Sequence, residues 1–233
     1  MDQDFSNDIE QGLINYLGQY VTAHKKRVME NVLSQRTRFF TVVLENIFKP
    51  HNASAVLRTC DCFGIQDVHV IEKTQVYKIN PFVTRGASQW VDLYKYHQPE
   101  NSGVQECFET LRNKGYKIFG TSPEANSIPL DQLNPNEKIA LVFGNEHEGI
   151  SEEVKQLADG LVHIPMHGFT ESFNISVAAS LFLHDLIQRA DKSKIPDFYL
   201  SDKEKKEIRL QWYRSVVKNS WIHEKVFRDS ISK

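Results

Sequence analysis

The chain has few of the features that mark secreted, membrane or zinc-binding proteins. It holds three cysteines in 233 residues, an odd number that is too small for a disulfide framework. Two of them, Cys60 and Cys62, are separated by one residue in a predicted helix, where we expect buried, reduced thiols. A zinc site would require more Cys or His ligands at coordinating spacing, and the sequence has none. No metal site is therefore predicted.

Long apolar runs and the common nucleotide-binding signatures are also missing. No segment approaches the ~20 apolar residues that span a bilayer, and the polar start MDQDFSNDIE does not resemble a secretory signal. Neither a G-x-G-x-x-G after the first predicted strand nor a Walker A lysine loop occurs. Hydrophobic residues still make up 40% of the chain, enough for a sizeable core. We expect one ordinary cytoplasmic domain with terminal additions.

Charge is spread unevenly along the chain, although the net charge is only −2. Residues 39–191 carry a net charge of −7 and residues 192–233 one of +5, while the neutral first 38 residues hold all five of their cations after His24. Basic ends around an acidic middle suit a polyanionic partner. Lys-rich terminal helices that only keep a protein soluble would give the same distribution.

Short apolar strands alternate with helices between residues 39 and 190. The predicted strands are FFTVVLENI, DVHVIE, QWVDLYKY, YKIFGTS, KIALVFG and LVHIP, and the predicted helices are NASAVLRTCDCFG, GVQECFETLRNKG, SEEVKQLADG with a capping box at its start, and the stretch from Ser172 towards Ala190. This alternation predicts an α/β fold with a mainly parallel sheet. Ligands of such sheets bind beyond the carboxyl ends of the strands, so the loops there form the candidate site.

Helical segments flank this region. Two helices are predicted before it, over about residues 9–20 and 22–35, and a Pro-containing linker leads to a charged, aromatic helix pair after residue 201. We therefore divide the chain into an N-terminal helical extension (1–38), a central domain (39–190) and a C-terminal helical extension (191–233).

Three of the predicted strand ends carry unusual polar loops. In KPHNASAVLRT, Asn52 begins a helix and Arg58 follows almost two turns later; capping by Asn52 and an ion pair at Arg58 would explain them structurally. In LVFGNEHEGIS, two glycines bracket Glu146, which suits close approach of the backbone to a ligand or simply a tight connection. In HIPMHGFTESFNISVAA, helix capping accounts for Ser172 or Asn174 but not for the whole polar set.

In this order, the three loops resemble the three sequence motifs of the SpoU branch of the SPOUT RNA ribose methyltransferases. KPHNASAVLRT matches the motif with Asn and Arg, LVFGNEHEGIS matches F-G-N-E-x-x-G, and IPMHGFTESFNISVAA matches I-P-M-x-G-x-x-x-S-x-N-x-S-x-A. The resemblance covers roughly residues 39–190, and the flanking sequences resemble those of the tRNA guanosine ribose methyltransferases that act on the D-loop. It implies a SPOUT-type sheet with a deep C-terminal trefoil knot that binds S-adenosylmethionine, and a homodimer packed through the knot region. The implied reaction is 2′-O-methylation of guanosine 18 in tRNA.

The resemblance also implies roles for individual residues. The implied catalytic residues are Asn52, Arg58, Glu146, Ser172 and Asn174, and the implied cofactor-binding residues are Thr121, Gly144, Ile164, Met166 and Phe173. The family commonly has Leu at the position of Phe173. If this ring faces the adenine, stacking would help cofactor binding, and if it faces the knot, it is only a larger filler. By resemblance, Arg58 activates the ribose hydroxyl. Because a guanidinium keeps its proton near neutral pH, we expect Arg58 to bind the neighbouring phosphate and stabilise the forming oxyanion.

The basic ends are expected to contact RNA. The predicted phosphate-binding residues are Lys25, Lys26, Arg27, Arg36, Arg38, Lys203, Lys205, Lys206, Arg209 and Arg214. Trp212, Tyr213 and Trp221 either stack on bases or pack within the protein. Ribosomal RNA as the substrate, or a non-catalytic RNA-binding protein on the same fold, are the alternatives to a tRNA methyltransferase; a small-molecule methyltransferase would leave the basic ends without a purpose.

Overall fold

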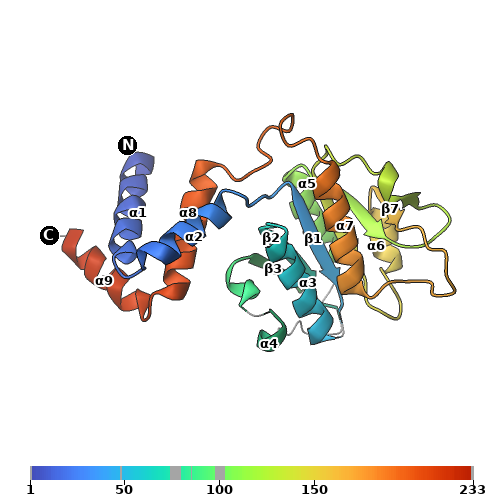
Figure 1. The fold of residues 1–233 in the computed structure, drawn as a ribbon, viewed down its shortest axis with the longest axis horizontal. Coiled ribbons are helices and arrows are strands. Elements are labelled where there is room, and N and C mark those ends of the chain that lie inside the picture. Colours follow the sequence, from blue (N-terminus) through green and yellow to red (C-terminus); the bar gives the residue numbers. More distant parts are fainter. Residues whose placement is uncertain (1, 48, 74–79, 85, 98–102, 232–233) are drawn as a thin grey trace. The chain divides into compact units, whose positions relative to one another are not determined.

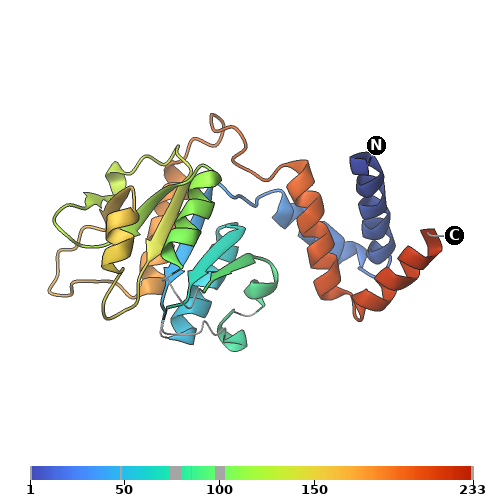
Figure 2. The same cartoon turned by 180° about the vertical axis from the view of Figure 1, so that it is seen from behind.

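The computed structural model describes residues 2–47, 49–73, 80–84, 86–97 and 103–231. It divides into two compact units, one of residues 37–198 and one of residues 1–36 together with 199–233 (Figure 1, Figure 2). The two predicted extensions thus form one structural unit, and the central unit reaches residue 198 rather than 190. The order of segments along the chain does not reveal this division, because helices from the two ends of the chain pack on each other and form a single unit.

Residues 37–198 contain a sheet in which every pair of neighbouring strands is parallel. The strands are β1 (Phe40–Glu45), β2 (Asp67–Ile71), β3 (Asp92–Tyr96), β4 (Lys117–Thr121), β5 (Ile128–Pro129), β6 (Ile139–Phe143) and β7 (Gly160–His163). Among the described residues their order is β3-β2-β1-β6-β4-β7-β5. The predicted α/β fold is confirmed. Only β5 was not predicted, because two residues are too short to give a strand pattern.

Helices cover both faces of this sheet. The helical elements of the unit are α3 (Pro50–Cys62), α4 (Pro81–Thr84), α5 (Val104–Asn113), α6 (Glu152–Leu157) and α7 (Ile175–Arg189), with the short 3-10 turns η1 (Ala87–Gln89) and η2 (Leu130–Gln132). α3 and α7 lie side by side (Figure 1) and share a core with Val42 of β1. α5 and α6 pack on the opposite face with Val43, because successive side chains of a strand point to opposite faces.

Three helix starts differ in detail from the predictions. The N-cap of α3 is Lys49, so Asn52 lies inside the helix and does not cap it. α7 begins immediately after its N-cap Asn174, which accepts a backbone hydrogen bond, and therefore starts later than predicted. Ser151 caps α6 by accepting the N–H of Val154, but a capping box needs Glu or Gln at that position. The prediction of a capping box there is wrong.

The second unit is a small helical assembly. Its helices are α1 (Asp2–Gly18), α2 (Ala23–Leu33), α8 (Asp202–Val216) and α9 (Ser220–Ile231). α1 packs against α8 and α9, and its Leu13 and Leu17 are buried, as is Trp212 of α8. A capping box between Ser201 and Glu204 begins α8. The helices predicted at both ends of the chain are confirmed, and they pack against one another.

The sequence predicts no membrane-spanning segment, no metal site and buried thiols at Cys60 and Cys62. Within the described residues, no helix is both long and apolar enough to span a bilayer, and no group of three His, Cys, Asp or Glu side chains could hold a metal ion. Cys60 is buried, but Cys62 is exposed. The prediction of a buried thiol at Cys62 is wrong, because α3 turns this position away from the sheet.

Candidate functional site

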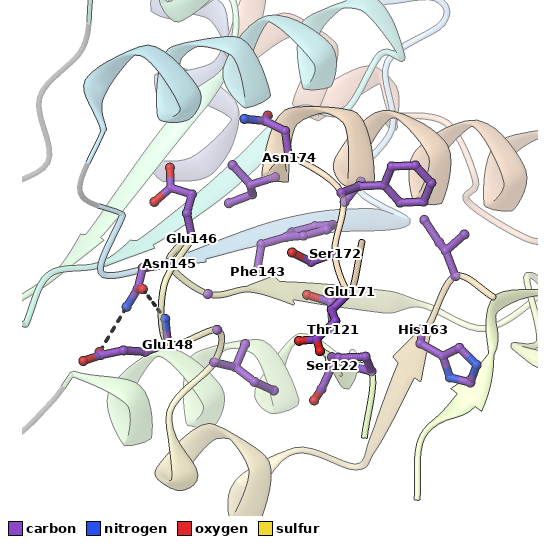
Figure 3. A pocket seen from close by; sticks show the side chains of 18 of the residues that line it. Thr121, Ser122, Phe143, Asn145, Glu146, Glu148, His163, Glu171, Ser172 and Asn174 are labelled. Atoms are coloured by element: carbon purple, nitrogen blue, oxygen red, sulfur yellow. Dashed lines mark hydrogen bonds between the residues drawn. The ribbon is translucent and has the colours of Figure 1, made fainter. Parts of the chain in front are cut away.

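A cleft opens at the carboxyl ends of the central strands. Its volume is about 540 Å³, which is in the range of small-molecule sites. The loops after β4, β6 and β7 and the first turn of α7 form its walls (Figure 3). The chain runs outward from β1 to β3 and then returns to the other side of β1. The cleft therefore lies beside the switch point of the sheet, where parallel α/β folds bind ligands.

One chain of hydrogen bonds joins all three sequence motifs at this cleft. The Nδ2 of Asn174 donates to the Oδ1 of Asn52 over 3.3 Å. The Nδ2 of Asn52 in turn donates to the Oε1 of Glu146. Since Asn52 uses both ends of its buried amide in this way, its place in the sequence is explained by the site and not by helix capping.

The carboxylate of Glu146 has one oxygen that no described residue satisfies. Its Oε2 is buried and has no hydrogen-bond partner there. A buried, unsatisfied carboxylate oxygen is costly, so a cationic or hydrogen-bond-donating group of a ligand would be favoured beside it. Figure 3 shows Glu146 on the cleft wall near the start of α7. This oxygen is the clearest polar contact point that the site offers to a ligand.

The loop between β6 and α6 is a tight turn that tolerates no side chain at Gly144. Asn145 and Gly149 exchange two backbone hydrogen bonds of 3.1 and 3.0 Å, and the Oδ1 of Asn145 accepts the N–H groups of His147 and Glu148. A Cβ added to Gly144 would lie 2.0 Å from the carbonyl of Gly149. The tight connection is confirmed, and close approach of this backbone to a ligand stays a prediction for glycines that line the cleft.

Every residue predicted to bind the cofactor lines this cleft. These residues are Thr121, Gly144, Ile164, Met166 and Phe173, and the predicted catalytic residues Glu146, Ser172 and Asn174 line it too. The Oγ1 of Thr121 donates to the carbonyl of Val142 over 2.9 Å and thus holds the end of β4 to β6. Figure 3 shows Thr121, Ser172 and Phe143 around the same opening.

Two predicted catalytic residues, Asn52 and Arg58, are not part of the cleft lining. Asn52 is hydrogen-bonded to lining residues, whereas Arg58 is not bonded to any of them in the described part of the chain. The Arg58 side chain is exposed on α3, six residues after Asn52. No hydrogen bond or ion pair connects it to another described residue, so the structural ion pair considered above is not found there. α3 is fixed against α7 next to it, by a hydrogen bond of 3.2 Å between Thr59 and Ser180.

An ion pair at the cleft was not visible in the sequence. Lys155 of α6 lines the cleft and pairs with Glu124, which follows β4, and with Glu152 over 2.6 Å. Hydrogen bonds to Glu124 and, to a smaller extent, to Glu152 raise the pKa of Lys155. No pattern connects Glu124 to Lys155, because they come from separate loops that only the sheet brings together.

Two of the predicted RNA-binding arginines are engaged inside the protein. Arg36 is 0% exposed, and its guanidinium lies 5.4 Å from the ring centre of Trp212. The prediction that Arg36 contacts phosphate is wrong, because burial in the helical unit removes it from solvent. Arg38 is 22% exposed and pairs with Asp67 over 2.8 Å and with Asp92 over 2.6 Å, so it joins the starts of β2 and β3.

Four of the predicted cations of α8 also have acidic partners. Arg209 bonds Glu30 through two nitrogens, and Arg214 bonds Glu224 in the same way. The lysines Lys205 and Lys206 lie 3.4 Å from Asp202 and 3.7 Å from Glu10. An anionic ligand would have to compete with these carboxylates.

Other predicted RNA contacts remain accessible. Lys25, Arg27 and Lys203 are exposed and Lys26 is half-buried, with Arg27 also hydrogen-bonded to His24 over 3.3 Å. Trp212 and Tyr213 are buried, so the packing alternative holds for them, whereas Trp221 is 70% exposed.

Comparison with known proteins agrees with the motifs. Residues 40–184 match the SpoU rRNA Methylase family. The chain is 45% identical to the tRNA (guanosine(18)-2'-O)-methyltransferase of Borreliella burgdorferi, over 88% of this chain and 92% of the relative. It is 34% identical to the protein of the same name from Thermus thermophilus, over 83% and 97% of the two chains.

Solved structures share the fold. The A. aeolicus TrmH/SpoU tRNA modifying enzyme superposes with a TM-score of 0.72 at 33% identity, over 83% of this chain and 96% of that one. The SpoU methyltransferase AviRb from Streptomyces viridochromogenes in complex with the cofactor AdoMet has a TM-score of 0.56 at 24% identity, over 68% and 63%. With three matching motifs at one cleft and relatives that align along most of their length, the chain belongs to the SpoU rRNA Methylase family.

Proposed function

We propose that this protein transfers a methyl group from S-adenosylmethionine to the ribose 2′-oxygen of guanosine 18 in tRNA. The observation that carries the proposal is the hydrogen-bonded chain Asn174–Asn52–Glu146, which joins three separate motifs beside one cleft. The relatives from Borreliella burgdorferi and Thermus thermophilus, which align over 88% and 83% of this chain, are named tRNA (guanosine(18)-2'-O)-methyltransferases, which favours tRNA over ribosomal RNA. We expect this activity in the cytoplasm.

The residues of the cleft fit S-adenosylmethionine. Ile164, Met166 and Phe173 provide apolar contact for an adenine ring, and the cleft volume of about 540 Å³ suits a molecule of that size. The buried, unsatisfied Oε2 of Glu146 suits a positively charged group. When bound, the cofactor supplies the methyl group. The knot implied by the resemblance is part of this proposal.

The protein's own residues would position the ribose and stabilise charge. A ribose hydroxyl is a weak nucleophile at neutral pH, so its proton must be removed and the oxyanion stabilised. Asn52 is held at both ends of its amide and can orient groups without reorganising. We assign phosphate binding and oxyanion stabilisation to Arg58, whose exposed side chain has no partner among the described residues.

A homodimer packed through the knot region would complete the enzyme. α7 exposes Val177 and Leu181, which are 45% and 40% exposed, one turn apart on the same face of the helix. Burying apolar side chains of this size against a second copy would be favourable. Arg58 is exposed on the neighbouring α3. We therefore place this surface, α7 with the exposed side of α3, in the dimer interface.

The decisive test is a methylation assay with mapping of the product. The protein is incubated with labelled S-adenosylmethionine and unmodified tRNA, and the methylated ribose is located by nuclease digestion. We expect label at the 2′-oxygen of guanosine 18, and loss of incorporation with retained tRNA binding for Arg58→Ala. Label on ribosomal RNA but not on tRNA would contradict the assigned substrate. Absence of transfer to any RNA, with RNA binding intact, would favour a non-catalytic RNA-binding protein.

A further inference from the structure

The last residue of β1, Glu45, is a buried carboxylate at the carboxyl edge of the sheet, and it has no role in the reaction proposed above. Its side chain is 2% exposed, and it lies at the carboxyl end of β1, next to the β6 strand that carries the loop 144–150. A buried carboxylate needs several hydrogen bonds or a cation to offset its loss of hydration. Its partners therefore show what the residue does.

The partners are Ser151, which directly follows loop 144–150, and Lys73, which follows β2. The Oε2 of Glu45 accepts the N–H of Ser151 over 2.8 Å, and its Oε1 accepts the Ser151 hydroxyl over 2.5 Å. The Nζ of Lys73 lies 2.8 Å from the same Oε1 and donates to the Ser151 hydroxyl over 2.9 Å. Glu45 thus forms a bidentate contact with a single loop residue, and Lys73 balances its charge.

Ser151 directly follows the loop that lines the cleft. That loop is attached at two points: Glu146 bonds Asn52 of α3, and Ser151 bonds Glu45 of β1. Between these two attachments, Ile150 is buried and packs closely on Gly120 of β4. A Cβ added to Gly120 would lie 2.6 Å from the Cδ1 of Ile150. The backbone between the two attachments is therefore held in one position relative to β1, β4 and α3.

We propose that Glu45 is a positioning residue for the cofactor loop 144–150, acting through Ser151. The proposal rests on the function assigned above, because it takes S-adenosylmethionine as the molecule that this loop contacts. A fixed loop binds its ligand without a loss of conformational freedom. Releasing Ser151 should consequently weaken cofactor binding while leaving tRNA binding to the basic residues unchanged.

The test compares Glu45→Gln with the matched control Glu72→Gln. Glu72 is also a carboxylate at the same edge of the sheet, but it pairs over 3.2 Å with Lys95 of β3, on the side of β2 that faces away from β6. We expect calorimetry to give a Kd for S-adenosylmethionine at least tenfold higher for Glu45→Gln and unchanged for Glu72→Gln. Saturating cofactor should restore kcat, and the Kd for tRNA should stay at the wild-type value.

Hydrogen exchange provides a readout that needs no cofactor. In Glu45→Gln the amides of residues 144–151 should exchange faster, while those of β1 and β6 keep their protection. If Glu45→Gln does not fold, Ser151→Ala carries the same test, since it removes the hydroxyl contact with Glu45 and keeps the backbone contact. Because this hydroxyl also caps α6 and accepts from Lys73, the exchange of the α6 amides is followed as its control. Wild-type cofactor affinity and loop exchange in the variant would overturn the proposal, as would equal losses in Glu72→Gln. If the wild-type protein binds no S-adenosylmethionine while Glu45→Gln still accelerates amide exchange in residues 144–151, the proposed function is overturned and the positioning role of Glu45 is not.

Discussion

The substitution Asn52→Asp tests the hydrogen-bonded chain that links the three motifs. It preserves the shape of the side chain but replaces the Nδ2 donor, which contacts Glu146, with a carboxylate oxygen. Two carboxylates then face each other in a partly buried site. At neutral or higher pH both are ionised and repel each other, whereas at lower pH the pair takes up a shared proton and regains a donor.

The size of the effect follows from Coulomb's law. Two like charges about 4 Å apart repel by roughly 4 kcal/mol at an effective dielectric constant of about 20. Since about 1.4 kcal/mol corresponds to a factor of ten, kcat/KM should fall by about two to three orders of magnitude at pH 8. Asn52→Ala removes the donor without adding charge, and leaving the Glu146 oxygen unsatisfied should cost about 1–3 kcal/mol at every pH.

The test measures initial rates of methyl transfer to tRNA from pH 6 to pH 8.5. Thermal melting of each variant shows whether it is folded. The deficit of Asn52→Asp relative to wild type should shrink as the pH falls, while that of Asn52→Ala stays constant. Parallel pH profiles for the two variants, or an Asn52→Asp protein with full activity at pH 8, would refute the reasoning.

Four further results are expected. Gly144→Ala should abolish cofactor binding in calorimetry, because its Cβ would lie 2.0 Å from the Gly149 carbonyl; retained binding would contradict the loop geometry. Burial, and secondarily Lys114, lowers the pKa of His69 to about 3, so the unfolded chain gains the proton first. The free energy of unfolding should therefore be unaffected by this group above about pH 6.5 and fall by roughly 2 kcal/mol between pH 6.5 and pH 5. Urea titrations of His69→Phe should not show this fall. Leu181→Asp should convert the proposed dimer to a monomer in sedimentation equilibrium, and an unchanged mass would move the interface elsewhere. tRNA affinity should fall steeply with added salt, and a flat response would remove the basic residues from the RNA contact.

Much of the fold and site could be predicted because the relevant signals are local. A strand buried on both faces is a short apolar run, and β1 and β6 are such runs. The glycine-containing turn after β6 and the polar loop before α7 are also contiguous segments. Their resemblance to family motifs predicted the residues that we propose contact the cofactor, and all of them line the cleft.

Only the tertiary structure decided how these segments meet. Asn52 bonds Glu146 across 94 positions and Asn174 across 122, and no periodicity records a contact at that separation. The same holds for Glu45, whose carboxylate bonds Ser151 across 106 positions. The charge pattern gave a wrong prediction at Arg36, which is buried, because a basic residue in a helical extension is usually exposed. Sequence determines which segments form strands, helices and turns, because those depend on neighbouring residues; packing determines which polar side chains become partners, because that depends on the path of the whole chain.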